Sequence, residues 1–194
     1  MSYLDEGELR GMGFAALGLE VRISRRASIY GAGRIRIGSY TRIDDFCVIS
    51  AGESGVDIGS YVHIAPFCLI TGSARVVLED FSGLSSRVSI YSSSDDYSGE
   101  HMTNPAVPSK YTGVVSAEVR LGRHAIVGAG AVVLPGSVLG EGAAVGSLSL
   151  VNRNVEAFSI VSGVPARKIK DRSRSLLETE RLLVADRGVP PSLG

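Results

Sequence analysis

A six-residue period runs through most of this sequence and limits its fold more strictly than any other feature. Fourteen six-residue units begin with Ile, Leu or Val, and the fifth residue of each is small or β-branched. Two consecutive units, for example, read Ile37-Gly-Ser-Tyr-Thr-Arg and Ile43-Asp-Asp-Phe-Cys-Val. An amphipathic helix repeats every 3.6 residues and a half-buried strand every two, so neither stays in phase with this period. The pattern indicates a stack of short repeats, a solenoid.

Each unit predicts a short strand followed by a sharp turn. The aliphatic first residue and the small fifth residue point inward, while glycine or aspartate beside the aliphatic residue permits the bend. Glycine accounts for 24 of the 194 residues, about 12%, against about 7% in an average protein. Three units close a triangular coil of about eighteen residues, and successive coils pair like parallel strands about 4.8 Å apart. We therefore predict an all-β, parallel β-helical prism of about six coils, roughly 30 Å long.

Departures from the period divide the chain. Residues 1–20 precede the repeat as an N-terminal arm, with a short helix expected over residues 5–12. Residues 21–170 form the repeat domain, from which a long polar loop, residues 92–117, departs. Residues 171–194 form a C-terminal helix and tail, with the helix over residues 173–186 and Pro190 and Pro191 beyond it. We expect the leucines of this helix to cover the last coil.

Composition and charge exclude several classes of protein. Twenty basic and twenty acidic residues give no net charge, so no overall field attracts nucleic acid or a membrane surface. The sequence has no long apolar run for a membrane span and no visible signal peptide. Cys47 and Cys68 occupy equivalent fifth positions in adjacent coils and are expected to stack inside the core. Two cysteines suit a reducing compartment, and we expect the cytoplasm.

The repeat resembles that of the hexapeptide acyltransferases, whose fold is a left-handed parallel β-helix. The stretches that begin Leu78-Glu-Asp-Phe-Ser-Gly-Leu and Asp95-Asp-Tyr-Ser-Gly-Glu-His resemble one branch of that family. It comprises N-acetyltransferases that act on nucleotide-linked 4-amino-4,6-dideoxy sugars, of the perosamine or viosamine type, for O-antigen synthesis. The resemblance implies a homotrimer that binds acetyl-coenzyme A, and a nucleotide-linked amino sugar, between neighbouring subunits.

The resemblance also implies where the cofactor binds. Small outward residues at Ala129 and Ser147 leave room for the pantetheine arm of acetyl-coenzyme A. The segment Gly163-Val164-Pro165-Ala166-Arg167-Lys168 matches the C-terminal motif of the family. Val164 and Pro165 are thus expected to contact the cofactor, and Arg167 and Lys168 to meet its adenosine phosphates.

Candidate acid–base residues are three histidines and two adjacent aspartates. Sugar O-acetyltransferases of the family carry a catalytic histidine before a Pro-Gly turn, where this sequence has Gly130, so an amine acceptor is favoured. We expect His63 and the pair Asp95 and Asp96 to act in catalysis, in preference to His101 and His124. Adjacent carboxylates can bind a cationic amine and accept its proton, and their mutual repulsion would raise the pKa of one. Each histidine also fits an ordinary solvated surface residue.

Several alternatives remain open at this point. Acetylation of a sugar hydroxyl or of an antibiotic would use the same fold, and a non-catalytic scaffold would also show the repeat. Some left-handed β-helices are zinc enzymes with three histidine ligands, but the spacing of the three histidines here makes convergence on a metal hard. The sequence leaves open the sugar, the nucleotide, and whether the base is a histidine, a carboxylate or water.

Overall fold

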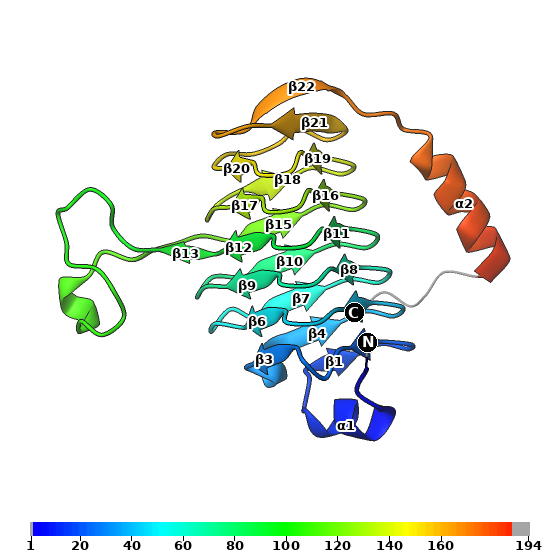
Figure 1. The fold of residues 1–194 in the computed structure, drawn as a ribbon, viewed down its shortest axis with the longest axis horizontal. Helices are drawn as coiled ribbons and strands as arrows, with labels where there is room; N and C mark the ends of the chain where they lie inside the picture. The colour runs from blue at the N-terminus through cyan, green and yellow to red at the C-terminus, as the bar shows by residue number, and fades with distance from the viewer. Residues whose placement is uncertain (1, 188–194) are drawn as a thin grey trace.

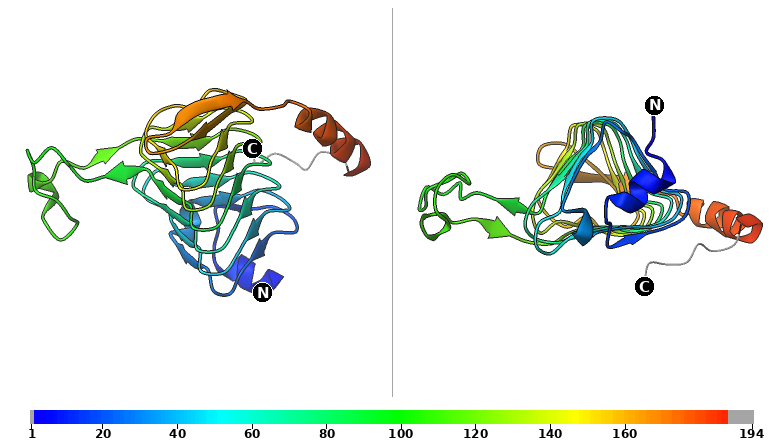
Figure 2. Two further views of the ribbon diagram at one scale, coloured as in Figure 1. Left: turned by 45° about the horizontal axis from the view of Figure 1, so that its top comes forward. Right: turned by 90° about the horizontal axis from the view of Figure 1, so that it is seen from below.

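The structure is a triangular prism of stacked coils, as the repeat predicts. It is a computed structural model and describes residues 2–187 of the chain. Three parallel sheets form the faces of the prism, and the chain passes from the first to the second to the third in every coil (Figures 1 and 2). We call these sheets face 1, face 2 and face 3, and the corners between them edges 1–2, 2–3 and 3–1.

The strands are short because each ends at a corner. Face 1 contains β1 (Ala16–Leu17), β4 (Ile35–Ile37), β7 (Val56–Ile58), β10 (Val76–Leu78), β15 (Val119–Leu121) and β18 (Val138–Leu139). Face 2 contains β2 (Arg22–Ile23), β5 (Arg42–Ile43), β8 (His63–Ile64), β11 (Gly83–Leu84), β16 (Ile126–Val127), β19 (Ala144–Val145) and β21 (Ser159–Ser162), with β22 (Arg167–Asp171) beyond. Face 3 contains β3 (Ser28–Tyr30), β6 (Val48–Ser50), β9 (Leu69–Thr71), β12 (Ser89–Tyr91), β17 (Val132–Val133) and β20 (Leu150–Val151).

In-register pairing places the first residues of the repeat units in columns along the core. Ile37 lies beside Ile58 and Ile58 beside Leu78, and all three are almost fully buried. Cys47 and Cys68 are also buried inside the prism as free thiols, as predicted. Two faces have six parallel strands and face 2 has a seventh, so the estimate of six coils falls slightly short. Burial of this aliphatic column is the main source of stability.

Both ends of the prism are covered by chain outside the repeat. At the N-terminal end, α1 (Glu6–Gly11) begins at the capping residue Asp5 and buries Leu9. At the C-terminal end, β22 pairs antiparallel with β21 and lies over the last coil (Figure 1). The prediction that the C-terminal helix covers this end is therefore wrong.

The C-terminal helix instead lies beside the prism. Helix α2 spans Leu176–Arg187 and stands off the side near edge 1–2 (Figure 1). Its leucines do not reach the last coil because β22, already paired with β21, occupies that position. Pro190 and Pro191 lie outside the described residues. No helix in residues 2–187 is long and apolar enough to cross a membrane.

The long loop forms an arm that projects from edge 3–1. After β12, strand β13 (Ser93–Ser94) pairs antiparallel with β14 (Val115–Ser116), and η2 (Ser109–Tyr111) lies near the tip. The arm and α2 leave the prism on opposite sides (Figure 2). A second 3₁₀ turn, η1 (Ala32–Arg34), marks an earlier insertion at edge 3–1. Of the fifth residues beside such insertions, Gly33 is exposed and Ala74 is only partly buried.

Candidate functional site

Two columns of corner residues flank face 2. Residues at equivalent corners adopt a left-handed backbone, which is uncommon for a residue with a side chain. The edge 1–2 column comprises Glu20, Tyr40, Tyr61, Phe81, His124, Gly142 and Phe158, and the edge 2–3 column comprises Phe46, Phe67, Arg87, Gly130 and Leu148. Neighbouring aromatic rings within each column stack at centroid distances of 4.9–5.0 Å.

A cavity of about 550 Å³ lies on face 2 between these columns. It is lined from edge 1–2 by Tyr61, Phe81 and His124, from face 2 by His63, Ser82, Gly83, Leu84 and Ile126, from edge 2–3 by Ala65, Ser85 and Ser86, and from the C-terminal segment by Arg172 and Leu176. Polar side chains with an apolar surround are typical of a small-molecule site.

Gly83 creates the depth of this cavity. It lies in register between His63 below and Ile126 above, on the outward side of face 2. A Cβ atom at this position would meet only the carbonyl oxygen of His63, at 3.8 Å, so the fold tolerates a side chain there. The glycine therefore leaves a notch between two larger side chains, and that notch opens beside His63.

His63 is half exposed and is held by a buried carboxylate. Its Nε2 atom lies 2.8 Å from Oδ2 of Asp44, whose side chain is only 1% exposed. Arg42 donates a second hydrogen bond to the same oxygen at 2.8 Å. Burial acts to raise the pKa of Asp44, but the hydrogen bonds from Arg42 and His63 outweigh it and the pKa is lowered. Asp44 is thus an ionised acceptor that fixes one nitrogen of the imidazole.

His124 is not the solvated surface histidine that the repeat position suggested. Its ring stacks on Phe81, and its side chain is 12% exposed. The Nε2 atom lies 2.6 Å from a carboxylate oxygen of Glu180, a residue of α2 that also contacts Arg123. Burial, with the positive charges of Arg123 and Arg172, lowers the pKa of His124 to about 4. His124 therefore joins α2 to the prism as a neutral donor.

The two arm aspartates have different environments. Asp96 accepts hydrogen bonds from the backbone N–H groups of Ser98 and His101, at 2.7 and 2.9 Å, and lies 3.1 Å from Nδ1 of His101. The hydrogen bonds from Ser98 and His101 lower its pKa well below the usual range, opposite to the repulsion we expected. Within residues 2–187, no group donates to the carboxylate of Asp95, which lines a cavity of about 730 Å³ beneath the arm.

One chain does not bring His63 and Asp95 together. His63 belongs to β8 on face 2, whereas Asp95 follows β13 in the arm, which departs from edge 3–1. His101 shares the arm and is bound to Asp96. The expectation that the arm carboxylates close over His63 is therefore not met within a single subunit.

The predicted cofactor residues gather along the upper part of edge 2–3. Ala129 and Ser147 are exposed in successive coils, and the backbone of Leu148 donates to the carbonyl of Ala129. Val164 and Pro165 form the next turn up this edge, joined by a cis peptide bond. Leu150 N–H donates to Gly163 C=O, which fixes that turn above Ser147. The four residues thus form one exposed strip.

The two predicted cations follow that strip along the chain, at the start of β22. Arg167 and Lys168 are exposed and line a depression of about 240 Å³ at the C-terminal end of the prism. The Nζ atom of Lys168 lies 2.9 Å from Asp171 and 3.1 Å from Glu156, and these contacts raise its pKa. A phosphate would have to displace these exposed carboxylates, so the role of Lys168 stays a prediction.

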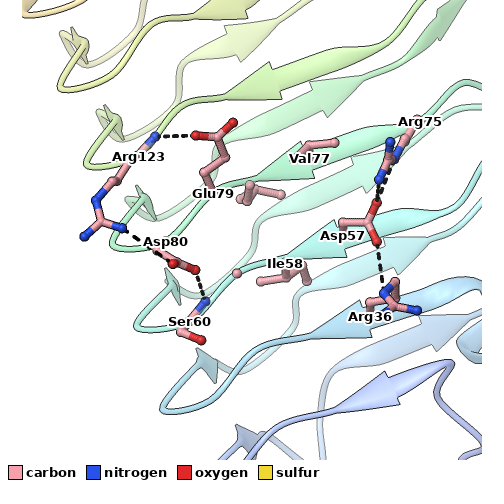
Figure 3. Close-up of a pocket in the computed structure, with 11 residues that line it drawn as sticks. Arg36, Asp57, Ile58, Ser60, Arg75, Val77, Glu79, Asp80 and Arg123 are labelled. Atoms are coloured by element: carbon pink, nitrogen blue, oxygen red, sulfur yellow. Dashed lines mark hydrogen bonds and ion pairs between the residues drawn. The ribbon is translucent and has the colours of Figure 1, made fainter. Parts of the chain in front are cut away.

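Face 1 carries another depression, of about 420 Å³, whose charges are already paired (Figure 3). Asp57 contacts both Arg36 and Arg75, at 3.8 and 2.6 Å. Asp80 accepts from the backbone of Ser60 at 2.7 Å, and Arg123 lies 3.7 Å away. Because positive and negative groups alternate, this surface lacks the concentrated charge that would attract an anionic cofactor.

Comparison with known proteins identifies the family. No protein-family model matches the chain. A relative from Escherichia coli, dTDP-4-amino-4,6-dideoxy-D-glucose acyltransferase, is 52% identical over 180 residues, which cover 93% of this chain and 94% of the relative. This chain belongs to that acyltransferase family. The prediction of an acyltransferase that resembles the enzymes of 4-amino-4,6-dideoxy sugars is therefore confirmed.

Solved structures agree with this assignment. AntD, an N-acyltransferase from Bacillus cereus, is 40% identical, superposes with a TM-score of 0.93, and is matched over 96% of this chain and 100% of its own. A maltose O-acetyltransferase from Clostridium difficile has a TM-score of 0.58 at 18% identity and shares only the fold. These matches confirm the left-handed β-helix of the hexapeptide acyltransferases.

Sequence reasoning did not single out two residues that line the face 2 cavity, Gly83 and Ser85, or Asp44, which contacts His63 beside it. Gly83 was one of many glycines, and Ser85 follows the first residue of a repeat unit, where small residues are common. Asp44 was read as part of the repeat turn. The register offered one signal for Asp44, because Ile43 stacks under Ile64 and so places residue 44 close to His63.

Proposed function

We propose that this protein transfers the acetyl group of acetyl-coenzyme A to the 4-amino group of a nucleotide-linked 4-amino-4,6-dideoxy sugar. The product would supply O-antigen or a similar polysaccharide, and the reaction would take place in the cytoplasm. The observation that carries the proposal is the 52% identity to an acyltransferase of dTDP-4-amino-4,6-dideoxy-D-glucose, over nearly the whole of both chains. Structures of AntD hold dTDP-4-amino-4,6-dideoxyglucose with coenzyme A, or dTDP with 3-hydroxybutyryl-CoA. dTDP is therefore the first nucleotide to test.

The repeat position of Gly130 supports an amine acceptor. Glycine supplies no side chain at that corner, where φ is +71°, so the histidine base of the sugar O-acetyltransferases is absent there. A hydroxyl needs such a base because its own pKa is far above neutrality. An amine becomes nucleophilic once its ammonium proton leaves, with a pKa of about 10.4 for a simple alkylamine. Electron-withdrawing sugar oxygens lower that value further.

The AntD structures also support a serine and an aspartate near the substrate. Variants of that protein in complex with these ligands replace a serine or an aspartate ten positions further along the chain. Ser85 and Asp95 have the same separation here, and Ser85 lines the face 2 cavity. Ser86 and Asp96 also fit the spacing, but the carboxylate of Asp96 is already bound within the arm. We assign the pair Ser85 and Asp95 to the acceptor.

A homotrimer would bring these residues together. The arm exposes large apolar side chains, with Tyr97 92% and Met102 58% exposed, which favours burial against another surface. If the arm of one copy docks on face 2 of the next, Asp95 approaches His63 and Ser85 across the interface. Such a contact joins two different surfaces, the arm of one copy and face 2 of the next. In a closed ring of three copies every arm and every face 2 has a partner.

The chemistry then requires no covalent enzyme intermediate. Asp95 holds the substrate ammonium by charge, and a base removes one proton to give the neutral amine. The amine lone pair attacks the thioester carbonyl carbon, and a backbone N–H stabilises the resulting oxyanion. When the tetrahedral intermediate collapses, the C–S bond breaks, and the coenzyme A thiolate takes up a proton. Ammonium and thioester thereby give amide, thiol and one proton released to solvent.

A substrate panel tests the proposed function. Purified protein is incubated with acetyl-coenzyme A and dTDP- or GDP-linked 4-amino-4,6-dideoxy sugars, and the products are measured by mass spectrometry. We expect a mass gain of one acetyl group on the amino sugar. The matching 4-hydroxy sugar nucleotide is the control, and its acetylation at a comparable rate would contradict the assignment of an amine acceptor. A parallel series with longer acyl-coenzyme A donors measures the preference for acetyl.

Subunit complementation tests the shared site. Two variants expected to have strongly reduced activity, His63→Ala and Asp95→Asn, are co-expressed with different affinity tags. Each closed trimer that contains both variants has one interface at which an intact face 2 meets an intact arm. Averaged over all randomly mixed trimers, about one quarter of the interfaces are intact, so we expect about one quarter of wild-type activity. Co-expression of His63→Ala with Gly83→Val is the matched control, because both changes damage face 2 and no interface is intact. A site contained in one subunit would recover nothing in either mixture.

A further inference from the structure

The contact between Asp44 and His63 has the form of an oriented base. Among the described residues, His63 has one hydrogen-bond partner, Asp44, through Nε2 at 2.8 Å. The side chain of Asp44 is 1% exposed, and its other oxygen, Oδ1, is buried with no partner in residues 2–187. The carboxylate therefore depends on Arg42 and His63 for all of its side-chain hydrogen bonds, both through Oδ2.

This contact fixes the tautomer of the imidazole. An ionised carboxylate can only accept hydrogen bonds, so Nε2 of neutral His63 carries the hydrogen. The lone pair is then on Nδ1, which has no partner among the described residues. A buried acceptor that fixes one nitrogen and leaves the other as a proton acceptor is the arrangement of general bases in many acyl-transfer sites.

The surroundings of His63 leave space for a substrate. The notch over Gly83 opens directly beside His63, and Ser85 lines the same cavity. Asp44, by contrast, is beneath the surface and is not among the residues that line the cavity. Any effect of Asp44 on the reaction would therefore pass through His63.

We propose that Asp44 is a positioning residue, which holds His63 as the proton acceptor for the substrate amine at the notch over Gly83. This inference rests on the proposed function and adds the identity of its base. In the forward step, one ammonium proton passes to Nδ1 of His63, and the resulting imidazolium stays paired with the Asp44 carboxylate. After the C–S bond breaks, the imidazolium returns that proton to the coenzyme A thiolate.

A double-mutant cycle tests the proposal. Wild type, Asp44→Asn, His63→Ala and the double variant are assayed for kcat and KM on the amino-sugar nucleotide. We expect Asp44→Asn to lower kcat about tenfold in the wild-type background, with KM changed less than about twofold. In the His63→Ala background the same change should have almost no effect on kcat. A similar fall of kcat in both backgrounds would overturn the proposal, because Asp44 would then act through the fold.

The neighbouring carboxylate provides a matched control. Asp45 contacts Ser24 and Arg26 rather than His63, so Asp45→Asn should leave kcat unchanged. Nitrogen-15 NMR of wild-type protein gives a measurement that needs no variant, and the neutral form of His63 should carry its hydrogen on Nε2 and none on Nδ1. The opposite tautomer would also overturn the proposal. Absence of any acylated sugar with wild-type protein would contradict the proposed function. If the product forms but Asp44→Asn lowers kcat equally with and without His63, only this inference is contradicted.

Discussion

The two edges that flank face 2 use the same backbone conformation but are covered very differently. Along edge 1–2, rings stack without a break from Tyr40 to His124, and Arg123 and α2 lie over the upper end. Along edge 2–3, the one pair of stacked rings within residues 2–187 is Phe46 and Phe67, which remain 47% and 51% exposed. Above them Arg87 packs over the ring of Phe67, Gly130 has no side chain, and Leu148 is 75% exposed.

This difference separates a structural edge from an open one. A left-handed conformation costs roughly 1–2 kcal/mol for a residue with a side chain, and a stacked aromatic pair returns about 0.5–1.5 kcal/mol. The continuous stack offsets that cost along edge 1–2 and fixes α2 to the prism. Edge 2–3 has fewer stacked rings to offset the cost of the left-handed conformation. Its corner side chains stay more exposed, beside the strip of predicted cofactor residues. Edge 1–2 therefore contributes more to the stability of the fold, and edge 2–3 is the more exposed of the two.

The largest expected effect lies between the edges, at the notch. Gly83→Val should lower kcat/KM about 100-fold, because displacing a substrate by about 1 Å has effects of that size. The melting temperature should change little, since a Cβ atom there would meet only the carbonyl oxygen of His63, at 3.8 Å. Ala144→Val is the control, an outward change two strands further along the same face and outside the cavity. Full activity of Gly83→Val would show that the substrate lies elsewhere.

The comparison of the two edges predicts unequal losses of stability. Phe81→Ala, in the covered stack, should cost about 2 kcal/mol, and Phe67→Ala, at the open edge, about 1 kcal/mol. For a chain of this length these values correspond to falls in melting temperature of about 6 °C and about 3 °C. Calorimetry of both variants checks this order. Equal losses would mean that the open edge supports the monomer as strongly as the covered one.

Charge reversal tests the expected cofactor phosphates at the end of the open edge. Arg167→Glu combined with Lys168→Glu should raise the KM for acetyl-coenzyme A about tenfold, and the effect should shrink in high salt. Arg181→Glu with Arg187→Glu makes the same change of charge on α2 and should leave that KM unaltered. An equal rise in the KM of both substrates would instead indicate a folding defect.

The smallest effect concerns the pH dependence of the covered edge. Burial, with Arg123 and Arg172, lowers the pKa of His124 to about 4, whereas the unfolded chain binds that proton near pH 6.5. The unfolded state therefore holds more protons between these values, and the free energy of unfolding should fall as the pH drops from about 6.5 to about 4. We expect a loss of about 1 kcal/mol, because the bond to Glu180 partly offsets the burial.

A non-titrating ring provides the control for this pH effect. His124→Phe keeps a stacked ring on Phe81 but cannot bind a proton. Denaturant unfolding of both proteins at a series of pH values should show a flatter profile for the variant over that range. The same slope in both proteins would place the titrating group elsewhere.

The sequence predicted the prism well because its information is periodic. Each first residue of a unit stacks on an equivalent residue one coil away, so one correct register places the whole core. The period also stops at the arm and after Val155, which gave the boundaries of both. The N-terminal helix was located within one residue at each end, because Asp5 and Glu8 form a reciprocal capping box.

The site was harder to predict because its contacts leave the period. His124 meets Glu180 across 56 residues of chain, and Glu180 lies beyond the repeat that would fix a register. The difference between Asp95 and Asp96 depends on a local turn in which backbone N–H groups reach only Asp96. The separation of His63 from Asp95 depends on which edge the arm leaves, and a spacing along the chain does not contain that information.

The covered ends of the prism also determine how the molecule behaves in a crowded solution. Parallel coils are a template for endless growth, because the last strand of one molecule has the right shape to pair with the first strand of another. At the C-terminal end, β22 runs antiparallel to β21 and so has the wrong direction for that pairing. At the N-terminal end, the backbone of Ser2 and Leu4 is hydrogen-bonded to the first coil and blocks pairing there. The protein therefore stays a discrete particle of fixed length, and loss of β22 would convert it into a unit able to form fibres.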